Sequence, residues 1–203
     1  MIAIIDYGLG NLGSIANMLK TIGEKSVITS DRNIILSADK LILPGVGSFD
    51  AGMKNLKELG LVEVIQSECM DKHKPIIGIC LGMQLLGRQS EEGHLHGLEL
   101  IPFDNIKFNL NEKSLKVPHM GWDIVEFKQK NPLINNLKGI QRYYFVHSYH
   151  AVCDFEENIL MTCDYGYEFT AAVVKENIYG VQFHPEKSHD FGMALLRNFV
   201  EKC

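Results

Sequence analysis

The chain has 203 residues, of which 46% are hydrophobic and 22% charged, and this suits a single globular domain spanning residues 1–203. The formal net charge of −5 lacks the basic footprint of a nucleic-acid-binding protein, and no apolar run reaches the ~18 residues of a membrane-spanning helix. The five cysteines are odd in number and scattered, with no C-x-x-C pair. They predict reduced thiols, a cytoplasmic location and no zinc or other metal site.

In the first half of the chain, apolar runs of strand length alternate with segments of helical period. Strands are predicted at residues 2–5, 26–29, 40–43 and 76–79. Helices are predicted at 12–22, at 53–70 with an interruption near Gly60, and from Met83 onward. Such an alternation predicts a parallel sheet that is covered by helices on both faces.

The second half is richer in strands. Residues 98–127 alternate in the manner of antiparallel strands, and further strands are predicted at 143–146, 159–162, 171–174 and 178–183. An amphipathic helix over 191–200 closes the chain. The sheet is therefore predicted to be mixed, with functional residues gathered at the carboxyl ends of its strands.

The N-terminal segment DYGLGNLGS places Gly8, Gly10 and Gly13 as G-x-G-x-x-G directly after the first strand. This pattern is found in dinucleotide-binding oxidoreductases, and Asp31 follows the second strand at a suitable distance for a ribose contact. A glycine pattern alone has low specificity, however, and further motifs have to decide.

The segment PIIGICLGMQLLG, residues 75–87, carries the clearest chemical signal. Cys80 lies between a buried strand and a helix, with Gly78 and Gly82 two positions to either side, as in a nucleophile elbow. Such a turn lifts the sulfur above the sheet and places it at a helix N-terminus, which favours the thiolate. The N–H of Leu81 would then face a developing oxyanion. Cys80 is a candidate nucleophile; the alternative is a buried cysteine in a tight turn.

A later H-P-E motif supplies a candidate base. His184 follows a predicted strand, the proline after it stiffens the turn, and Glu186 lies where its carboxylate can reach the imidazole. The other histidines lack this setting. His119 and His147, which have aromatic or apolar neighbours, fit either core packing or the rim of a site.

The segment LILPGVGSFD ends a strand in Pro44–Gly47. Two glycines around Val46 allow the backbone to approach a ligand and to rotate its peptides, so this loop can supply a second oxyanion donor. The alternative is an ordinary strand-to-helix turn in which Ser48 or Asp50 caps the helix.

Taken together, G-I-C-L-G-M-Q and the later H-P-E resemble the glutamine amidotransferases that use a Cys-His-Glu triad. With P-G-V-G, DYGLGNLGS and the P-H-M-G-W of residues 118–122, the chain is similar over its whole length to the HisH family, the glutaminase subunits of imidazole glycerol phosphate synthase. The resemblance implies a flavodoxin-like α/β fold with a mixed, mainly parallel central sheet and helices on both faces. It also implies hydrolysis of L-glutamine to glutamate and ammonia, without a cofactor.

The resemblance further implies roles for individual residues. Cys80 would attack the side-chain amide, His184 would transfer the proton and Glu186 would hold His184. The oxyanion would be surrounded by Val46, Gly47 and Leu81. Substrate contacts are implied for Gln84, Glu92, Ser148 and Tyr149, and partner contacts for Asn11, Met120, Trp122 and Lys187.

The implied partner is a HisF-type cyclase subunit, which would form a heterodimer with the chain and use the ammonia to make imidazole glycerol phosphate and AICAR in histidine biosynthesis. Ammonia in neutral water is mostly ammonium, which has no lone pair for attack, so a sheltered path favours a tight complex. In this family the turn at Gly8–Gly13 lies at the mouth that meets the partner and serves no pyrophosphate. The segments LGRQSEEG and SHDFG are also similar to HisH paralogues that supply ammonia for amidation of a bacterial surface sugar.

Three alternative functions from other protein classes can be compared with the glutaminase interpretation. A dinucleotide-binding oxidoreductase leaves Cys80, His184 and Glu186 unexplained. A non-catalytic binding subunit has no need of an intact triad. A cysteine hydrolase acting on another amide, such as a peptidase, keeps the triad, but Gln84 and Glu92 favour a small amino-acid substrate.

Overall fold

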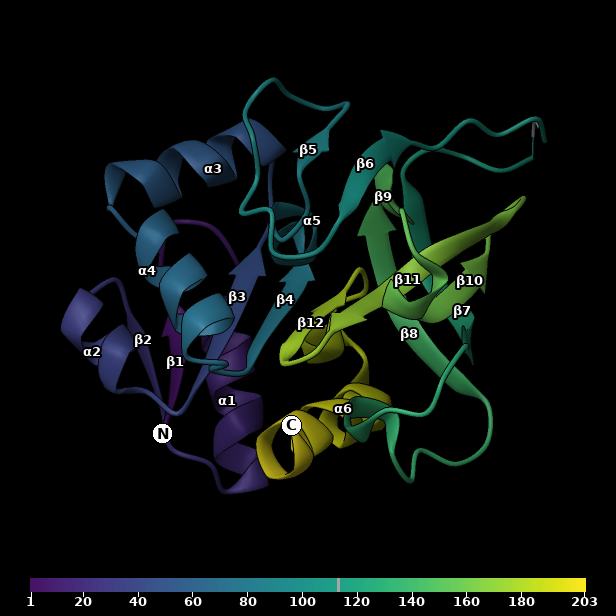
Figure 1. Ribbon diagram of the computed structural model, residues 1–203. Coiled ribbons are helices and arrows are strands. Elements are labelled where there is room, and N and C mark those ends of the chain that lie inside the picture. Colours follow the sequence, from purple (N-terminus) through teal and green to yellow (C-terminus); the bar gives the residue numbers. More distant parts are fainter. Residues whose placement is uncertain (113) are drawn as a thin grey trace.

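A mixed sheet forms the centre of the molecule in the computed structural model, which describes residues 1–112 and 114–203 (Figure 1). The parallel part of the sheet contains, in spatial order, β2 (Ser26–Thr29), β1 (Ile2–Ile5), β3 (Lys40–Gly45), β4 (Ile76–Cys80) and β12 (Ile178–Val181). The mixed sheet predicted from the sequence is thus confirmed.

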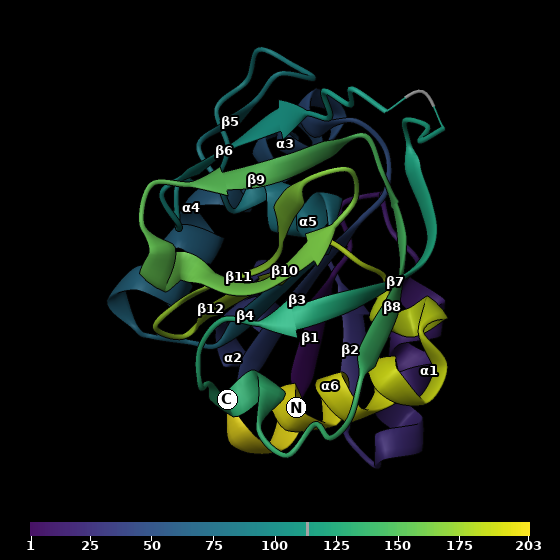
Figure 2. The same ribbon diagram turned by 90° about the vertical axis from the view of Figure 1, so that its right-hand side faces the viewer.

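Antiparallel strands extend this sheet beyond β12. They are, in spatial order, β11 (Glu168–Lys175), β10 (Ile159–Asp164), β7 (His119–Phe127) and β8 (Gln141–His147). A branch consists of β9 (Tyr149–Cys153), which pairs with β11, then β6 (Phe103–Lys107) and the short β5 (Gln89–Ser90). Apart from the short β5, these strands lie on the right in Figure 1, the side that faces the viewer in Figure 2.

Helices cover both faces of the parallel part, because its strands are apolar on both sides. In β1, Ile2 and Ile4 join one core cluster, whereas Ala3 and Ile5 join the other. The first cluster is covered by α1 (Leu12–Ile22) and α6 (His189–Lys202), which contact each other. The second is covered by α2 (Arg32–Ser37), α3 (Phe49–Glu58), α4 (Val62–Gln66) with its π-helical continuation Ser67–Asp71, and α5 (Leu81–Leu85). Among the described residues, no helix has both the length and the apolar composition needed to cross a membrane.

The predicted bounds hold best for the long periodic segments. Helix α1 has both predicted ends, and Gly23, with φ 94°, forms its left-handed C-cap. The predicted interruption at Gly60 separates α3 from α4, although α3 begins at Phe49, four residues before the predicted start. The strand expected to reach residue 183 ends at Val181. Helix α5 likewise begins at Leu81, two residues earlier than predicted.

One α-helix, α2, and two strands, β5 and β9, are among the short elements that were not predicted. Helix α2 has only six residues and depends on the Asp31 side chain, which accepts hydrogen bonds from the backbone N–H groups of Asn33 (2.7 Å) and Ile34 (3.3 Å). This role as a helix cap removes the observation that had favoured a ribose contact at Asp31. Strand β9 follows β8 after one residue, so sequence periodicity alone does not separate the two.

Candidate active site

Three neighbouring parallel strands, β3, β4 and β12, deliver the predicted motifs to one edge of the sheet. A cavity of about 320 Å³ opens there. Its lining contains nine of the residues for which the resemblance implies a catalytic, oxyanion or substrate-binding role: Val46, Gly47, Cys80, Leu81, Gln84, Glu92, Ser148, Tyr149 and His184. It also contains Pro118, Val146 and His147. Segments as far apart in the chain as Val46 and His184 therefore meet around one small space.

The turn at Cys80 has the geometry of a nucleophile elbow. Cys80 has φ 55°, in the left-handed region that non-glycine residues rarely occupy. A Cβ atom on Gly82 would lie 1.8 Å from the carbonyl oxygen of Leu43, and one on Gly78 would lie 2.6 Å from the carbonyl oxygen of Gly82. Only glycine fits at either position, which accounts for the G-x-C-x-G spacing.

His184 is held by Glu186 and lies beside Cys80. Its Nδ1 is 2.8 Å from Oε1 of Glu186, and both side chains are 1% exposed. Burial alone would lower the pKa of His184, but the Cys80 sulfur and the Glu186 carboxylate raise that pKa to about 9. Among the described residues, Nε2 has no hydrogen-bond partner. Because Nδ1 is engaged by the carboxylate, Nε2 is the nitrogen that can exchange a proton with the sulfur.

The backbone of His184 is fixed by a residue that the sequence analysis missed. The hydroxyl of the buried Ser188 donates to the His184 carbonyl (2.6 Å) and accepts from the Tyr144 N–H (3.0 Å). The His184 N–H in turn donates to the Tyr144 carbonyl (2.9 Å). A serine before a helix is normally assigned to capping, but Ser188 makes no side-chain cap bond to α6.

Gln182 is a second residue that the sequence analysis missed, and it connects Gln84 to Cys80. The Gln84 Nε2 donates to Oε1 of Gln182 (3.1 Å) and to the Tyr149 carbonyl (3.2 Å). The Gln182 Nε2 donates to the Cys80 sulfur (3.8 Å). Both amide hydrogens of Gln84 are thus used inside the protein, and its carbonyl oxygen is the group left for a ligand.

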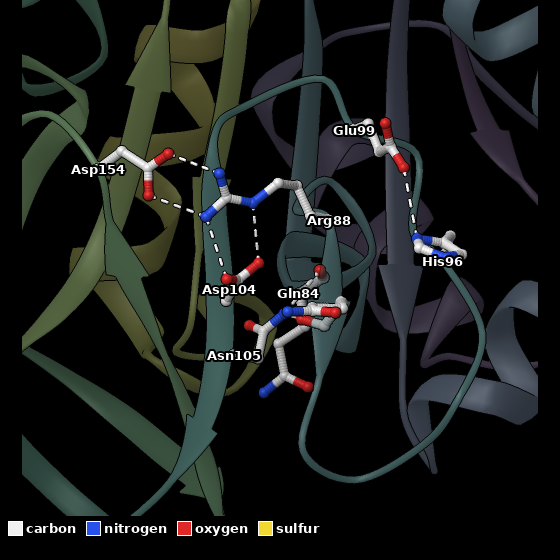
Figure 3. Close-up of polar contacts among 8 residues, drawn as sticks. Gln84, Arg88, His96, Glu99, Asp104, Asn105 and Asp154 are labelled. Atoms are coloured by element: carbon white, nitrogen blue, oxygen red, sulfur yellow. Dashed lines mark hydrogen bonds and ion pairs between the residues drawn. The ribbon is translucent and has the colours of Figure 1, made fainter.

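A set of polar contacts anchors the chain that leaves α5 (Figure 3). Arg88 forms paired hydrogen bonds to Asp104 (2.9 and 3.1 Å) and to Asp154 (2.5 and 2.8 Å). The Asn105 side chain donates to the backbone carbonyl of Gln84 (3.1 Å), near the end of α5. These contacts fix both ends of the 89–103 segment, which carries Glu92.

Glu92 itself caps α3. Its carboxylate accepts a hydrogen bond from the Phe49 N–H (2.8 Å), the first residue of that helix. Asp50 instead accepts from the N–H groups of His94 (2.9 Å) and Leu95 (3.0 Å), and Ser48 makes no side-chain cap bond. Ser48 thus occupies the N-cap position of α3, as the alternative reading allowed, but the capping hydrogen bond comes from Glu92 and not from the side chain of Ser48 or Asp50. The segment with Glu92 is therefore docked against the first turn of α3, the helix that follows the loop with Val46 and Gly47.

The histidine pair His119 and His147 both packs in the core and borders the site. His147 lines the cavity, and its Nδ1 bonds to the Tyr149 carbonyl (2.8 Å). Its Nε2 is 3.1 Å from Nδ1 of His119, the facing residue on β7. Burial lowers the pKa of His147 to about 3, so this imidazole is neutral at pH 7.

The residues expected to contact a partner lie outside the cavity lining. Met120 and Trp122 project from β7 with exposed fractions of 61% and 42%. Trp122 packs edge-on against Tyr144, and the Lys187 ammonium lies 5.6 Å above the Tyr144 ring. Asn11 precedes α1, which contacts the turn Pro185–Lys187. Exposed aromatic and apolar side chains next to an active site are typical of a protein interface.

The glycine-rich N-terminal turn packs against the loop Pro44–Gly47. Gly8 and Gly10 have φ angles of 82° and 122°, which favour glycine. A Cβ atom on Gly10 would lie 3.2 Å from the Pro44 side chain. These glycines thus allow a tight turn beside the candidate oxyanion loop.

Comparison with known proteins agrees with this site. Residues 3–203 match the family of class-I glutamine amidotransferases. Relatives named imidazole glycerol phosphate synthase subunit HisH 2 from Methanococcus maripaludis and Pseudomonas aeruginosa are 57% and 50% identical to this chain. The alignments cover 100% of both chains for the first and 99% of both chains for the second. A glutamine amidotransferase crystal structure superposes with a TM-score of 0.76 at 16% identity, covering 99% of this chain and 98% of that one, which supports the fold.

Proposed function

The chain belongs to the class-I glutamine amidotransferases and, within them, to the HisH family, and we propose that it hydrolyses L-glutamine through Cys80, His184 and Glu186. The observation that carries this proposal is the arrangement of three side chains at one cavity. Cys80 lies in an elbow turn, the imidazole of His184 has an Nε2 without a partner among the described residues, and the buried carboxylate of Glu186 bonds to its Nδ1. These are a nucleophile, a base and an orienting group.

The reaction has two halves. The Cys80 thiolate attacks the side-chain amide carbon of glutamine, and the protonated His184 gives its proton to the leaving nitrogen. Ammonia departs and a thioester remains on the sulfur. His184, now neutral, takes a proton from water, which attacks the thioester and releases glutamate and the thiolate. The Glu186 carboxylate stabilises the imidazolium in both halves.

Hydrogen-bond donors for the tetrahedral oxyanion are proposed at the Leu81 N–H and in the loop that contains Val46 and Gly47. Gly47 has φ 113°, and Val46 is 42% exposed at the cavity. A peptide between two glycines can present either its N–H or its C=O to the cavity, so this loop can exist in an active and a resting arrangement.

The remaining lining residues suit the α-amino-acid end of glutamine. The free side-chain carbonyl oxygen of Gln84 and the Glu92 carboxylate are acceptors, as an ammonium group requires. Ser148 and Tyr149 border the same cavity and are proposed to hold the substrate backbone. This polar end favours a small amino acid over a peptide.

The proposed partner is a HisF-type cyclase that receives ammonia for imidazole glycerol phosphate formation in histidine biosynthesis. The names of the HisH relatives and the exposed Met120 and Trp122 support it. A second candidate is ammonia supply for amidation of a surface sugar, with the same glutaminase chemistry. Two observations support this second candidate. Two relatives carry the numeral 2 in their names, and the segments LGRQSEEG and SHDFG are similar to the surface-sugar paralogues.

A glutaminase assay tests the proposal. The chain is assayed alone and with a HisF-type cyclase and its acceptor ligand, and glutamate release is measured. We expect turnover in the presence of partner and acceptor, and its loss in Cys80→Ala. Absence of glutamate release in every mixture would refute the glutaminase function. Activity with the cyclase of a surface-sugar system, and none with that of the histidine pathway, would select the second candidate.

A further inference from the structure

The Tyr7 side chain carries a buried hydroxyl that the proposed mechanism does not use. Tyr7 follows β1, and its side chain is 1% exposed. Its backbone carbonyl accepts a hydrogen bond from the Asn55 side chain (2.8 Å), which fixes the residue. Among the described residues, however, the hydroxyl has no hydrogen-bond partner. Because buried hydroxyls are normally paired, this one calls for an explanation.

The hydroxyl lies between the candidate oxyanion loop and the elbow. A Cβ atom on Gly45 would be 2.3 Å from the Tyr7 oxygen, 2.9 Å from the Gly82 nitrogen and 2.9 Å from the Leu81 Cβ. Gly45 begins the loop and pairs in register with Cys80. Burial, with a contribution from the charge of Cys80, raises the pKa of Tyr7, so the phenol keeps its proton and can donate it.

A rotation of the Gly45–Val46 peptide has consequences on both of its sides. Turning the N–H toward the cavity turns the carbonyl oxygen of the same peptide away from it. Val46 lines the cavity and Tyr7 does not. The carbonyl oxygen would then enter a buried region, where an unpaired acceptor is costly.

We propose that Tyr7 is a positioning residue whose hydroxyl donates a hydrogen bond to this carbonyl when the loop adopts its active arrangement. The unpaired hydroxyl raises the free energy of the resting arrangement, and pairing lowers that of the active one. Both effects favour the arrangement in which an N–H faces the oxyanion. This inference rests on the proposed glutaminase function and adds a residue to it.

Tyr7→Phe tests the role, because it removes only the hydroxyl. In the complex with a HisF-type cyclase and its acceptor ligand, we expect kcat for glutamine hydrolysis to fall by about tenfold, the worth of one hydrogen bond. KM for glutamine should be unchanged, since the bond forms only in the active loop. The thermal unfolding midpoint should stay equal or rise, because an unpaired buried hydroxyl is gone.

Tyr179→Phe is the matched control. Tyr179 is also a buried tyrosine, on β12, but it packs against Phe199 and does not line the cavity. Its variant should keep the wild-type kcat. If Tyr7→Phe also keeps the wild-type kcat, or raises KM as much as it lowers kcat, the positioning role is wrong while the glutaminase function stands. Wild-type protein without glutaminase activity would overturn the proposed function and this role together.

Discussion

Burial makes four of the five thiols of the chain harder to deprotonate. Burial raises the pKa of Cys69 and of Cys153 to about 12, and it raises the pKa of Cys163 and of Cys203 as well. Cys80 is different because it lines the cavity beside the protonated His184. Since the thiolate is the reactive form, reactivity should concentrate at Cys80.

An electrophilic glutamine analogue should therefore label Cys80 alone. Peptide mass spectrometry after short exposure gives the site of labelling, and Cys80→Ala should abolish it without unfolding the protein. Excess L-glutamine should slow the labelling, because both ligands need the same cavity. Comparable labelling of Cys69 or Cys163 would show that the candidate nucleophile has been misassigned.

The raised pKa of His184 makes the stability of the fold depend on pH. The folded imidazole, with a pKa of about 9, binds its proton more tightly than the unfolded one, whose pKa is about 6.5. The resulting stabilisation is complete below about pH 6.5 and is lost as the pH rises through about 9. The difference in unfolding free energy between wild type and His184→Gln, measured with urea, should therefore shrink from pH 6 to pH 10.

Two variants sharpen this test. Glu186→Gln removes a charge that favours the imidazolium of His184, so in this variant the stabilisation of the fold should be lost at a lower pH than in the wild type. His96→Gln, at an exposed loop position, should leave the profile unchanged. A difference between wild type and His184→Gln that stays constant over the whole range would contradict the raised pKa.

At the active site, local constraints were predictable and long-range contacts were not. Cys80 and His184 were found because the glycines of the elbow and the proline after the histidine are visible within a few residues. Tyr7 and Gln182 were missed because Gly45 and Cys80, which they approach, lie 38 and 102 positions away along the chain. Ser188 bonds to His184 only four positions away, but its role also depends on Tyr144, 44 positions away. No local pattern shows that a glutamine on a buried strand will donate to a particular sulfur.

The same distinction holds for whole elements. Helix α1 and strands β1 and β2 have the predicted bounds, because periodicity and a glycine cap specify them locally. Strand β9 depends on pairing with β6 and β11, and the segment around Glu92 has no regular structure to predict. Its position comes from the contacts of Arg88, Asp50 and Glu92 with distant elements.

Arg88 should consequently affect substrate binding from outside the cavity. Arg88→Ala removes four hydrogen bonds that anchor the segment carrying Glu92. We expect KM for glutamine to rise by about three- to tenfold, the worth of roughly one hydrogen bond, with a smaller change in kcat. Because the ion pairs are partly exposed, the thermal unfolding midpoint should fall only slightly.

Arg88→Lys should recover only part of the affinity, since an ammonium cannot bind two carboxylates through paired hydrogen bonds. Lys128→Ala removes another exposed ion pair, with Glu168 (2.7 Å), and should leave KM unchanged. A kcat that falls while KM stays constant would show that Arg88 does not act through the Glu92 segment.

In the whole molecule, the two parts of the sheet have separable tasks. The parallel strands β3, β4 and β12 place the proposed reacting groups, whereas the antiparallel strand β7 carries Met120 and Trp122 outward. The antiparallel part reaches the cavity through two residues. Pro118 directly precedes β7, and His147 is the last residue of β8; both line the cavity. A partner seated on β7 would therefore contact a strand that is continuous with the wall of the cavity.

This arrangement predicts that partner binding changes turnover more than substrate affinity. The isolated chain should bind glutamine yet hydrolyse it slowly if, as proposed, the loop at Val46 lacks its oxyanion donor in the resting arrangement. Partner plus acceptor should raise kcat by about 100-fold or more, the worth of one oxyanion donor, while KM changes little. Gly47→Val should remove this stimulation, because a β-branched residue disfavours φ 113°.

Lys187 provides the test at the proposed interface, since it follows Glu186 of the proposed triad and its ammonium lies above the Tyr144 ring, next to Trp122. Lys187→Ala should weaken the stimulation of kcat by the partner and spare the labelling of Cys80, because the nucleophile itself is untouched. Lys130→Ala, an exposed lysine outside both the cavity and the proposed interface, should match the wild type. Steady-state kinetics of each chain, alone and with partner and acceptor, decide the matter. If the isolated wild-type chain already turns over at the stimulated rate, the loop is no switch and the chain is a self-sufficient glutaminase.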